Sequence, residues 1–460
     1  MTRSTFLMIL AALAFSLSLC AAAADFKPVS DAEASQLAQR VKTEAQQAWQ
    51  GYMTYAAGHD ALRPLSEKPQ DWYAHSLLMT PVDAYDTLLL MGLKAEAAQA
   101  HELIVTQLDF DRDIYVKHFE ITIRMLGGLL SGYQLSGDAK LLALAEDLAK
   151  RMLPAFDSPT GLPYTEVNLH TGKTRGAESG PAETGTLLLE YGTLSKLTGN
   201  PMYYDKAKRA LSETFKRRSA IGLVGAGINV ESGDWIDVDS HVGGGIDSYY
   251  EYLYKCWKLF GDADCKRMWD ASIPAINRYL ADEVRGELWY GHADMRSGAR
   301  GKTIYGALDA FFPAVLALSG DFDRARRLQE SGLKMWRLNH MEPEALDYRQ
   351  MRVTNGAYAL RPEIVESAYY LHHYTGDPQY RAMGREFFAD FVRYCRTRSG
   401  YAALKDVRTK QKTDSMESFV FAETFKYYYL LFAPRQTLDF DSVVFNTEAH
   451  PLRRDAATRR

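Results

Sequence analysis

The sequence predicts an all-α protein, a single closed (α/α)7 barrel of seven helical hairpins with small β-hairpins in its long loops. Three observations lead to this prediction. A short turn motif recurs about every sixty residues, apolar helical runs precede these turns, and amphipathic runs follow them. A closed ring of hairpins requires this alternation, because its inner helices are buried on all sides and its outer helices face water.

The recurring motif is a glycine followed by an acidic or amide residue. The glycine is expected to adopt the left-handed conformation that ends one helix, and the Asp or Asn to cap the next helix. The motif occurs at Gly137-Asp138, Gly199-Asn200, Gly261-Asp262, Gly320-Asp321 and Gly376-Asp377, with a weaker copy at Met91-Gly92. These six short turns therefore join helices in pairs.

The helical runs differ on the two sides of these turns. Residues 121–135 and 362–374 are apolar nearly all round, as is the run at 185–197, whereas 205–218 and 323–336 carry charge on one face. An opening helix near residues 31–57 and a closing helix at 416–432 complete the pattern. About fourteen helices, alternately outer and inner, are expected.

Long connections rich in glycine and proline separate each outer helix from the next inner helix. Examples are residues 156–181, 220–244 and 338–361, and stretches such as 162–171 alternate enough to form small hairpins. The topology places all tight turns at one end of the barrel and all long loops at the other. A binding site is expected at the loop end.

The ends of the chain carry separate signals. An apolar run at 6–19 followed by alanines predicts a signal peptide over residues 1–24, so that the mature chain starts near Asp25 and is secreted or periplasmic. Lipid anchoring at Cys20 is disfavoured by the bulky Leu19 before it. The barrel domain is predicted over 25–451, and 452–460 is predicted to be a disordered basic tail. No later apolar run is long enough to span a membrane.

Composition restricts the function. The formal charge is −4 over 460 residues, with no basic stripe, so nucleic-acid binding is not expected. Cys256 and Cys265 flank a predicted turn, and both a disulfide and two buried thiols agree with that spacing. The chain is expected to be a monomer.

Carboxylates gather in the first turns of the predicted inner helices. One such residue ordinarily serves the helix dipole, but six helices that repeat it around one axis suggest acid–base groups or a cation site. Paired carboxylates without a Ser-His or Cys-His arrangement indicate glycoside hydrolysis. The residues are Asp83, Asp86, Glu120, Glu183, Asp247, Glu251, Glu363, Glu366, Glu417 and Glu423. The aromatic residues near them, Phe119, Tyr249, Tyr250, Trp289, Tyr290 and Phe419, are candidates either for stacking on sugars or for the core.

Six motifs in this chain resemble, in order, those of class I α-mannosidases, glycoside hydrolase family 47. They extend from about Asp71 to Pro451 and include Val82-Asp83-Ala84-Tyr85-Asp86, Phe119-Glu120 with Arg124, Ile246-Asp247-Ser248-Tyr249-Tyr250-Glu251, Arg361-Pro362-Glu363 with Glu366, Phe421-Ala422-Glu423, and Asn446-Thr447-Glu448-Ala449-His450-Pro451. The fold of that family, a barrel of seven helix pairs, agrees with the fold predicted from the recurring glycine turns.

The resemblance implies a calcium-dependent exo-α-1,2-mannosidase that acts on mannose-containing oligosaccharides with inversion. Glu363 would match the general base, and Glu120 and Asp247 the two candidate proton donors. Thr447 would match the direct protein ligand of Ca²⁺, through its hydroxyl and carbonyl oxygens. Substrate binding is expected of Arg124, Glu366, Phe419, Glu423 and Glu448, and the glutamates Glu363, Glu366, Glu423 and Glu448 would also hold the waters bound to Ca²⁺.

Two departures from the family pattern bear on specificity. Many members carry a histidine where this chain has Ala307, and some carry an arginine where it has Gly245. The branch preference of the glycan substrate therefore stays open. A catalytically silent relative that binds mannosylated glycans is the alternative function, and a six-hairpin sugar enzyme such as an epimerase is disfavoured by the absence of a six-fold repeat.

Overall fold

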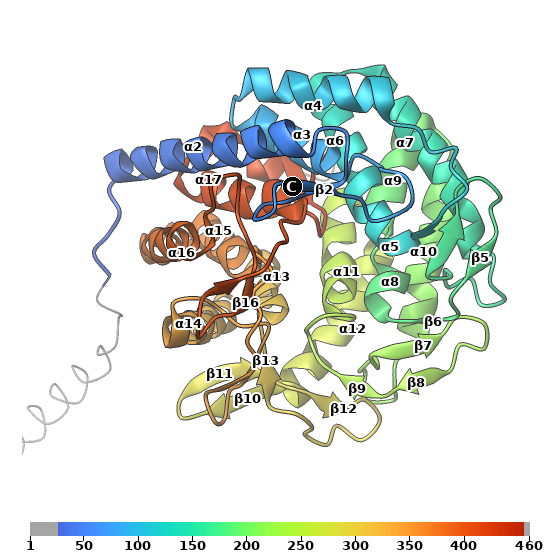
Figure 1. Ribbon diagram of the computed structural model, residues 1–460. Helices are drawn as coiled ribbons and strands as arrows, with labels where there is room; N and C mark the ends of the chain where they lie inside the picture. Colours follow the sequence, from blue (N-terminus) through green and yellow to red (C-terminus); the bar gives the residue numbers. More distant parts are fainter. Residues whose placement is uncertain (1–25, 455–460) are drawn as a thin grey trace, which may run out of the picture.

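The structure is a computed structural model that describes residues 26–454, so the predicted signal peptide lies outside the described part. Outer and inner helices alternate along this part of the chain (Figure 1). The outer helices are α2 (Asp31–Tyr55), α4 (Lys94–Gln107), α7 (Ala139–Met152), α10 (Pro201–Lys216), α12 (Ala263–Tyr279), α14 (Phe322–Asn339) and α16 (Gln379–Cys395). The inner helices are α3 (Met79–Leu90), α6 (Gly127–Ser136), α9 (Leu188–Thr198), α11 (Asp247–Phe260), α13 (Phe312–Ser319), α15 (Glu363–Thr375) and α17 (Lys426–Phe432).

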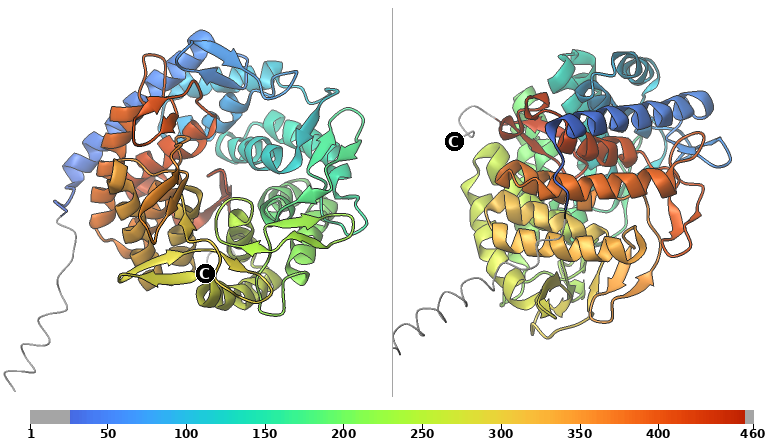
Figure 2. Two further views of the ribbon diagram at one scale, coloured as in Figure 1. Left: turned by 60° about the horizontal axis from the view of Figure 1, so that its bottom comes forward. Right: turned by 90° about the vertical axis from the view of Figure 1, so that its left-hand side faces the viewer.

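The inner helices form a closed ring. Each contacts the next in chain order, and the π-helix η4 (Val420–Phe425), which leads into α17, packs against α3 and closes the ring. The left-hand view of Figure 2 shows the helices around a central space. The predicted (α/α)7 barrel is thereby confirmed.

The tight turns adopt the predicted conformation. Their glycines have φ between +68° and +93°. The side chain of Asp262, for example, accepts hydrogen bonds from the backbone N–H groups of Asp264 and Cys265 at the start of α12. The same turn is closed by a disulfide between Cys256 of α11 and Cys265 of α12, which decides between the two possibilities for these cysteines. The remaining cysteine of the described residues, Cys395, is buried and free.

Short antiparallel strands connect neighbouring loops at the opposite rim. Strand β3 pairs with β4 from the next loop, β6 with β7, β9 with β12, and β13 with β14, so the loops brace one another around the barrel. The strands are β1 (Ala61–Arg63), β2 (Lys68–Gln70), β3 (Tyr115–Lys117), β4 (Glu166–Asn168), β5 (Thr174–Arg175), β6 (Glu178–Ser179), β7 (Gly227–Asn229), β8 (Trp235–Asp237), β9 (Asp239–Ser240), β10 (Ala281–Val284), β11 (Glu287–Tyr290), β12 (Ala293–Asp294), β13 (Ile304–Tyr305), β14 (Ala345–Asp347), β15 (Arg352–Asn355), β16 (Leu404–Asp406) and β17 (Gln411–Lys412). The prediction of small hairpins in the long loops is confirmed.

A C-terminal hairpin occupies the interior of the ring. Strand β18 (Val443–Phe445) pairs with β19 (Pro451–Arg453), β18 packs on α11 and β19 on α6. The predicted disordered tail at 452–460 therefore starts too early: Leu452 is fully buried and pairs with Val444. The hydrophobic interior of the ring holds this segment in place, and residues 455–460 lie outside the described part.

Among the described residues, the structure contains no helix with the length and apolar character needed to cross a membrane.

Candidate active site

One cavity of about 520 Å³ opens among the long loops, and every site residue that the family resemblance predicts lines it. The predicted residues are Glu120, Arg124, Asp247, Glu363, Glu366, Phe419, Glu423, Thr447 and Glu448. Loop residues such as Gly244, Gly245 and Leu308 form part of the wall. The site therefore lies at the end of the barrel that the loop lengths predicted.

Glu120 and Arg124 lie one helical turn apart at the beginning of the second inner helix. Glu120 belongs to the short helix α5 (His118–Ile121), and Arg124 to a π-helix, η1 (Thr122–Leu126), that continues into α6. The Arg124 guanidinium donates through Nε to Glu120 Oε2 at 3.0 Å and also pairs with Glu448. Because π-turns are concentrated at functional sites, the widened turn agrees with a role for Arg124 in the pocket.

Asp247 is the first residue of α11 and lies deep in the pocket, where its side chain keeps partial contact with solvent. Its Oδ1 accepts a hydrogen bond of 2.8 Å from the backbone N–H of Ser248. Burial raises the pKa of Asp247 to about 7, and the negative charge of Glu251 adds to the increase. A carboxyl group with this pKa can be protonated near neutral pH, as a general acid must be.

Glu363 is the first residue of α15, and Arg361 lies beside it in the same pocket. The closest approach of the two side chains is 4.0 Å, between Arg361 Nη1 and Glu363 Oε1. Burial raises the pKa of Glu363 to about 8, although the positive charge of Arg361 opposes the increase. The other carboxylate oxygen, Oε2, is buried and has no hydrogen-bond partner in the protein. No protein donor therefore satisfies this oxygen.

Three further glutamates gather on the floor of the pocket. Glu423 is carried by the second π-helix, η4, and its pKa is raised by burial and then by the charges of Glu448, Glu363 and Glu366. Thr447 lies beside Glu448 at the tip of the C-terminal hairpin, where its backbone N–H donates to Tyr252 Oη at 3.2 Å. A group of buried carboxylates that raise one another's pKa values is unfavourable unless a cation or protons compensate the charge.

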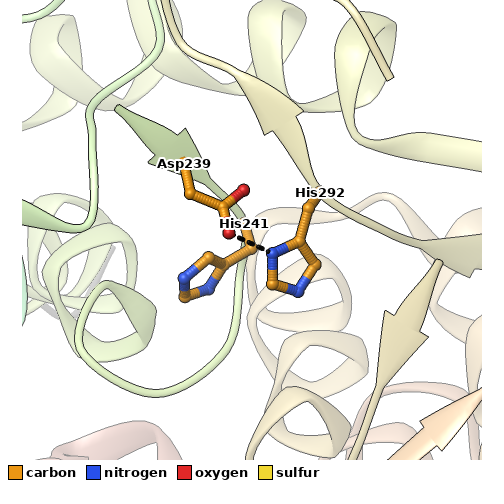
Figure 3. Close-up of side chains that lie close together, drawn as sticks. All are labelled: Asp239, His241 and His292. Carbon is orange, nitrogen blue, oxygen red and sulfur yellow. Dashed lines mark hydrogen bonds and ion pairs between the residues drawn. The ribbon is translucent and has the colours of Figure 1, made fainter. Parts of the chain in front are cut away.

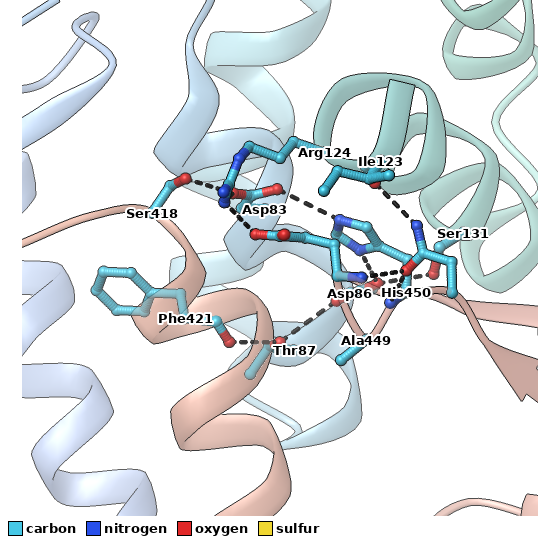
Figure 4. Close-up of polar contacts among 12 residues, drawn as sticks. Asp83, Asp86, Thr87, Ile123, Arg124, Ser131, Ser418, Phe421, Ala449 and His450 are labelled. Carbon is cyan, nitrogen blue, oxygen red and sulfur yellow. Dashed lines mark hydrogen bonds and ion pairs between the residues drawn. The ribbon is translucent and has the colours of Figure 1, made fainter. Parts of the chain in front are cut away.

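A buried polar network holds the hairpin tip (Figure 4). His450 Nδ1 lies 2.7 Å from Asp86 Oδ2, and Lys426 Nζ lies 2.8 Å from Asp86 Oδ1. Lys426 also donates to the carbonyl oxygen of Ala449, and Asn446 Nδ2 donates to the carbonyl oxygen of Ile123. Helices α3 and α17 and the π-helix η1 thus fix the residues on both sides of Thr447.

Some carboxylates of the predicted ring have other roles. Asp83 and Asp86 are fully buried in this network, below the pocket rather than on its surface. Glu417 accepts a hydrogen bond from Trp72 Nε1 at 3.2 Å and does not line the pocket. Of the aromatic candidates, Phe119 and Phe419 line the cavity, whereas Tyr249, Tyr250, Trp289 and Tyr290 belong to the core.

Two residues at or behind the pocket, Arg361 and Glu342, were assigned no role from the sequence. Arg361 lines the pocket and forms hydrogen bonds of 3.0 and 3.1 Å with the two carboxylate oxygens of Glu344. Behind Glu363, Glu342 is completely buried without a partner for either carboxylate oxygen, and its pKa is raised by burial and by the charge of Glu363. In the sequence, only neighbouring residues could have pointed to these two side chains. Arg361 directly precedes Pro362-Glu363, and Glu342 and Glu344 flank Pro343.

Gly245 and Ala307, the two positions that depart from the family pattern, lie at or next to the pocket wall. Gly245 lines the pocket with φ +92°, and an added Cβ would meet no atom within 4 Å, so space for a side chain is open there. Ala307 is fully buried beside Leu308, which lines the pocket.

With its ring of helical hairpins and an acidic pocket at the loop end, the protein belongs to the class of α/α barrels that carry a carboxylate site. The model of glycosyl hydrolase family 47 matches residues 44–454, and the chain belongs to that family.

Relatives extend over most of this chain. Alpha-mannosidase I MNS4 of Arabidopsis thaliana is 38% identical over 91% of this chain and 70% of its own length. The human ER degradation-enhancing alpha-mannosidase-like protein 2 is 36% identical over 90% of this chain and 77% of its own length. The structure is similar to that of an alpha-1,2-mannosidase from Trichoderma reesei, with a TM-score of 0.84, 28% identity, and coverage of 92% of this chain and 99% of that chain.

Proposed function

We propose that this protein is an exo-acting α-1,2-mannosidase that hydrolyses mannose-containing oligosaccharides with inversion and depends on Ca²⁺. The observation that carries the proposal is the arrangement of Glu120, Asp247 and Glu363, which come from three different inner-helix starts and line one cavity. The names of the Arabidopsis relative and the Trichoderma structure support the substrate class.

In the proposed reaction, one carboxylic acid protonates the glycosidic oxygen while Glu363 removes a proton from the attacking water. An inverting enzyme holds its two carboxyl groups roughly 6.5–9.5 Å apart so that water fits between the base and the anomeric carbon. Glu363 lines the cavity, where its carboxylate could orient that water.

The surroundings of the two candidate acids favour Asp247 as the donor. The Glu120 carboxylate is already engaged by Arg124, whose Nε donates a hydrogen bond of 3.0 Å to Glu120 Oε2. Asp247 instead lies next to Glu251, and its pKa of about 7 favours the protonated form. Arg124 and Phe419, whose ring lies 5.6 Å from the guanidinium, would then hold the substrate together with Glu366, Glu423 and Glu448.

The donor set fits Ca²⁺. Calcium prefers hard oxygen ligands and tolerates waters among them, and the hairpin tip presents Thr447 beside Glu448 and close to Glu423. Thr447 would bind the ion directly, while Glu363, Glu366, Glu423 and Glu448 would bind its waters. The positive charge of the bound ion would offset the mutual repulsion of these glutamates and favour the ionised form of Glu363 that a general base requires.

We also propose that the protein acts outside the cytoplasm. The disulfide between Cys256 and Cys265 supports this location, because disulfides persist mainly in oxidising compartments. The monomeric state stays a prediction.

The test is hydrolysis of α-1,2-linked mannobiose, with proton NMR to identify the first anomer released, before and after treatment with a calcium chelator. We expect β-mannose, loss of activity on chelation and recovery when Ca²⁺ is added. Initial release of α-mannose would overturn the inverting mechanism. If folded, calcium-loaded protein binds the disaccharide without cleaving it, the function is that of a silent glycan-binding relative.

A further inference from the structure

A second group of potential metal ligands lies in the loops outside the described pocket lining. Strand β9 (Asp239–Ser240) pairs with β12 (Ala293–Asp294), with Ser240 opposite Ala293. This pairing brings Asp239 and His241 from one loop next to His292 from another (Figure 3). None of the three lines the cavity that contains Glu363, so the group is distinct from the proposed active site.

The three side chains have the spacing of a ligand set. One ligand atom from each lies within 4.8 Å of the other two. His292 Nδ1 lies 2.9 Å from Asp239 Oδ2, and the two imidazole rings are 4.5 Å apart between centroids. Zinc binds imidazole nitrogen and carboxylate oxygen at roughly 2.0–2.2 Å, so ligand atoms on neighbouring coordination positions are about 3 Å apart. Small shifts of the three side chains would therefore bring their ligand atoms to the spacing that a bound zinc ion requires.

A buried nitrogen without a partner supports a ligand at this place. His241 Nδ1 is buried and has no hydrogen-bond partner in the protein. An unpaired buried nitrogen is unfavourable, and coordination to a metal ion would satisfy it.

We propose that Asp239, His241 and His292 bind a divalent transition-metal ion with affinity for imidazole, with Zn²⁺ as the representative ion and water completing its coordination. The combination of two imidazoles and one carboxylate suits such ions and differs from the all-oxygen surroundings of Thr447. His292 is 13% exposed and Asp239 22% exposed, so the ligands are largely shielded and still within reach of an ion from solvent.

Lys302 competes with a cation at this site. Its Nζ lies 2.9 Å from Asp239 Oδ2, the oxygen that also contacts His292, and its side chain is 69% exposed. An exposed lysine can move into solvent when a metal ion takes its place, but its positive charge opposes binding. Removal of this charge is therefore expected to strengthen metal binding.

A bound ion would fix one wall of the active-site pocket. Residues 241–246 connect His241 directly to Asp247 at the start of α11, and Gly244 and Gly245 of this segment line the cavity. Metal binding at His241 would tie this segment to the loop that carries His292.

The experiment measures zinc bound per chain by equilibrium dialysis and elemental analysis, on full-length protein freed of metals and then saturated with Ca²⁺. Excess Ca²⁺ competes for the oxygen-rich pocket, and the histidine variants assign the bound zinc to the second site. We expect one Zn²⁺ per chain in the wild type, at least a ten-fold weaker affinity in His241→Gln and in His292→Gln, and a tighter affinity in Lys302→Gln.

The matched control is His170→Gln. His170 Nδ1 lies 2.7 Å from Asp111, so this variant removes an imidazole paired with a carboxylate elsewhere on the loops. It should bind zinc as the wild type does. Thermal unfolding without zinc shows whether each variant is folded. Absence of zinc binding by the wild type, or equal binding by folded His241→Gln and His292→Gln, would overturn the proposal whether or not the protein hydrolyses mannosides.

Discussion

His450 Nδ1 and Asp86 Oδ2 are 2.7 Å apart, with both side chains completely buried, and the pair fixes the hairpin that presents Thr447 to the pocket. Burial alone would lower the pKa of His450, but the charge of Asp86 and the hydrogen bonds to Asp83 and Asp86 outweigh it and raise the pKa to about 9. The imidazolium form is therefore part of the folded protein at neutral pH.

Because the folded-state pKa of His450 lies above its unfolded value of about 6.5, its contribution to stability is fully present below pH 6.5 and is lost as the pH rises through about 9. His450→Gln should lower the free energy of unfolding by about 3–5 kcal/mol at pH 6.5, because Asp86 loses a buried partner. Urea unfolding at pH 6.5 and pH 9 measures both effects. An equal loss at the two pH values would contradict a charged His450.

Glu363→Gln should fold normally and reduce kcat on α-1,2-mannobiose by about 10²–10⁴-fold, since an amide cannot accept the proton of the attacking water. Initial rates and calorimetry on the same preparation separate the loss of chemistry from the loss of fold. Turnover at the wild-type rate would exclude Glu363 as the base.

Asp247 and Glu120 are distinguished by the pH dependence of kcat/KM. If Asp247 donates the proton, activity falls on the alkaline side as its carboxyl group ionises, near its pKa of about 7. Asp247→Asn should lose this activity at all pH values, whereas Glu120→Gln should keep the alkaline decline. A Glu120→Gln variant whose activity no longer falls at high pH would reassign the donor to Glu120.

Calcium should raise the melting temperature of the wild type, because a ligand that binds only the folded state stabilises it according to its concentration and affinity. Thr447→Val replaces the hydroxyl by a methyl group of similar size and should abolish most of this shift. Thr43→Val, at an exposed position of α2, is the control and should keep the full shift. A full calcium shift in Thr447→Val would place the ion elsewhere.

Gly376 ends α15 with φ +70°, and a Cβ built there would meet no atom within 4 Å. Gly376→Ala should therefore cost about 1–2 kcal/mol through backbone strain alone. Gly332 lies inside α14, where a Cβ would make an ordinary contact of 3.6 Å with Ile364, so Gly332→Ala should stabilise by about 0.5–1 kcal/mol. Chemical denaturation of both variants measures these changes in the free energy of unfolding. It tests whether the backbone conformation at a glycine, rather than the space around it, determines the effect of an added Cβ.

The ring of helices was predictable because its signals are local. Gly261 and Asp262 favour a turn through their own backbone and side-chain preferences, independently of distant residues. The same holds for the other tight turns. The carboxylates of the site were predictable because they interrupt otherwise apolar helix starts and stand in motifs that resemble one family. Membership of that family is confirmed by the match over residues 44–454.

The C-terminal hairpin was not predictable in the same way. Three-residue strands show no periodicity, and Leu452 is buried because strand β19 packs on α6, which is distant in the sequence. Lys426 looks like a surface residue of the last inner helix, yet it is fully buried against Asp86, more than three hundred positions away. Arg361 likewise acquires its role through Glu344, which lies 17 positions away in the sequence.

The hairpin has a consequence for the order in which the protein acquires its parts. Glu120, Asp247 and Glu363 are translated well before Thr447, which lies between the last two strands of the described chain. A nascent chain that has completed six helix pairs holds all its candidate acid and base groups but has not yet received the threonine proposed to bind calcium. Hydrolytic competence would then arise only after residues 443–453 have been synthesised and their two strands enter the ring.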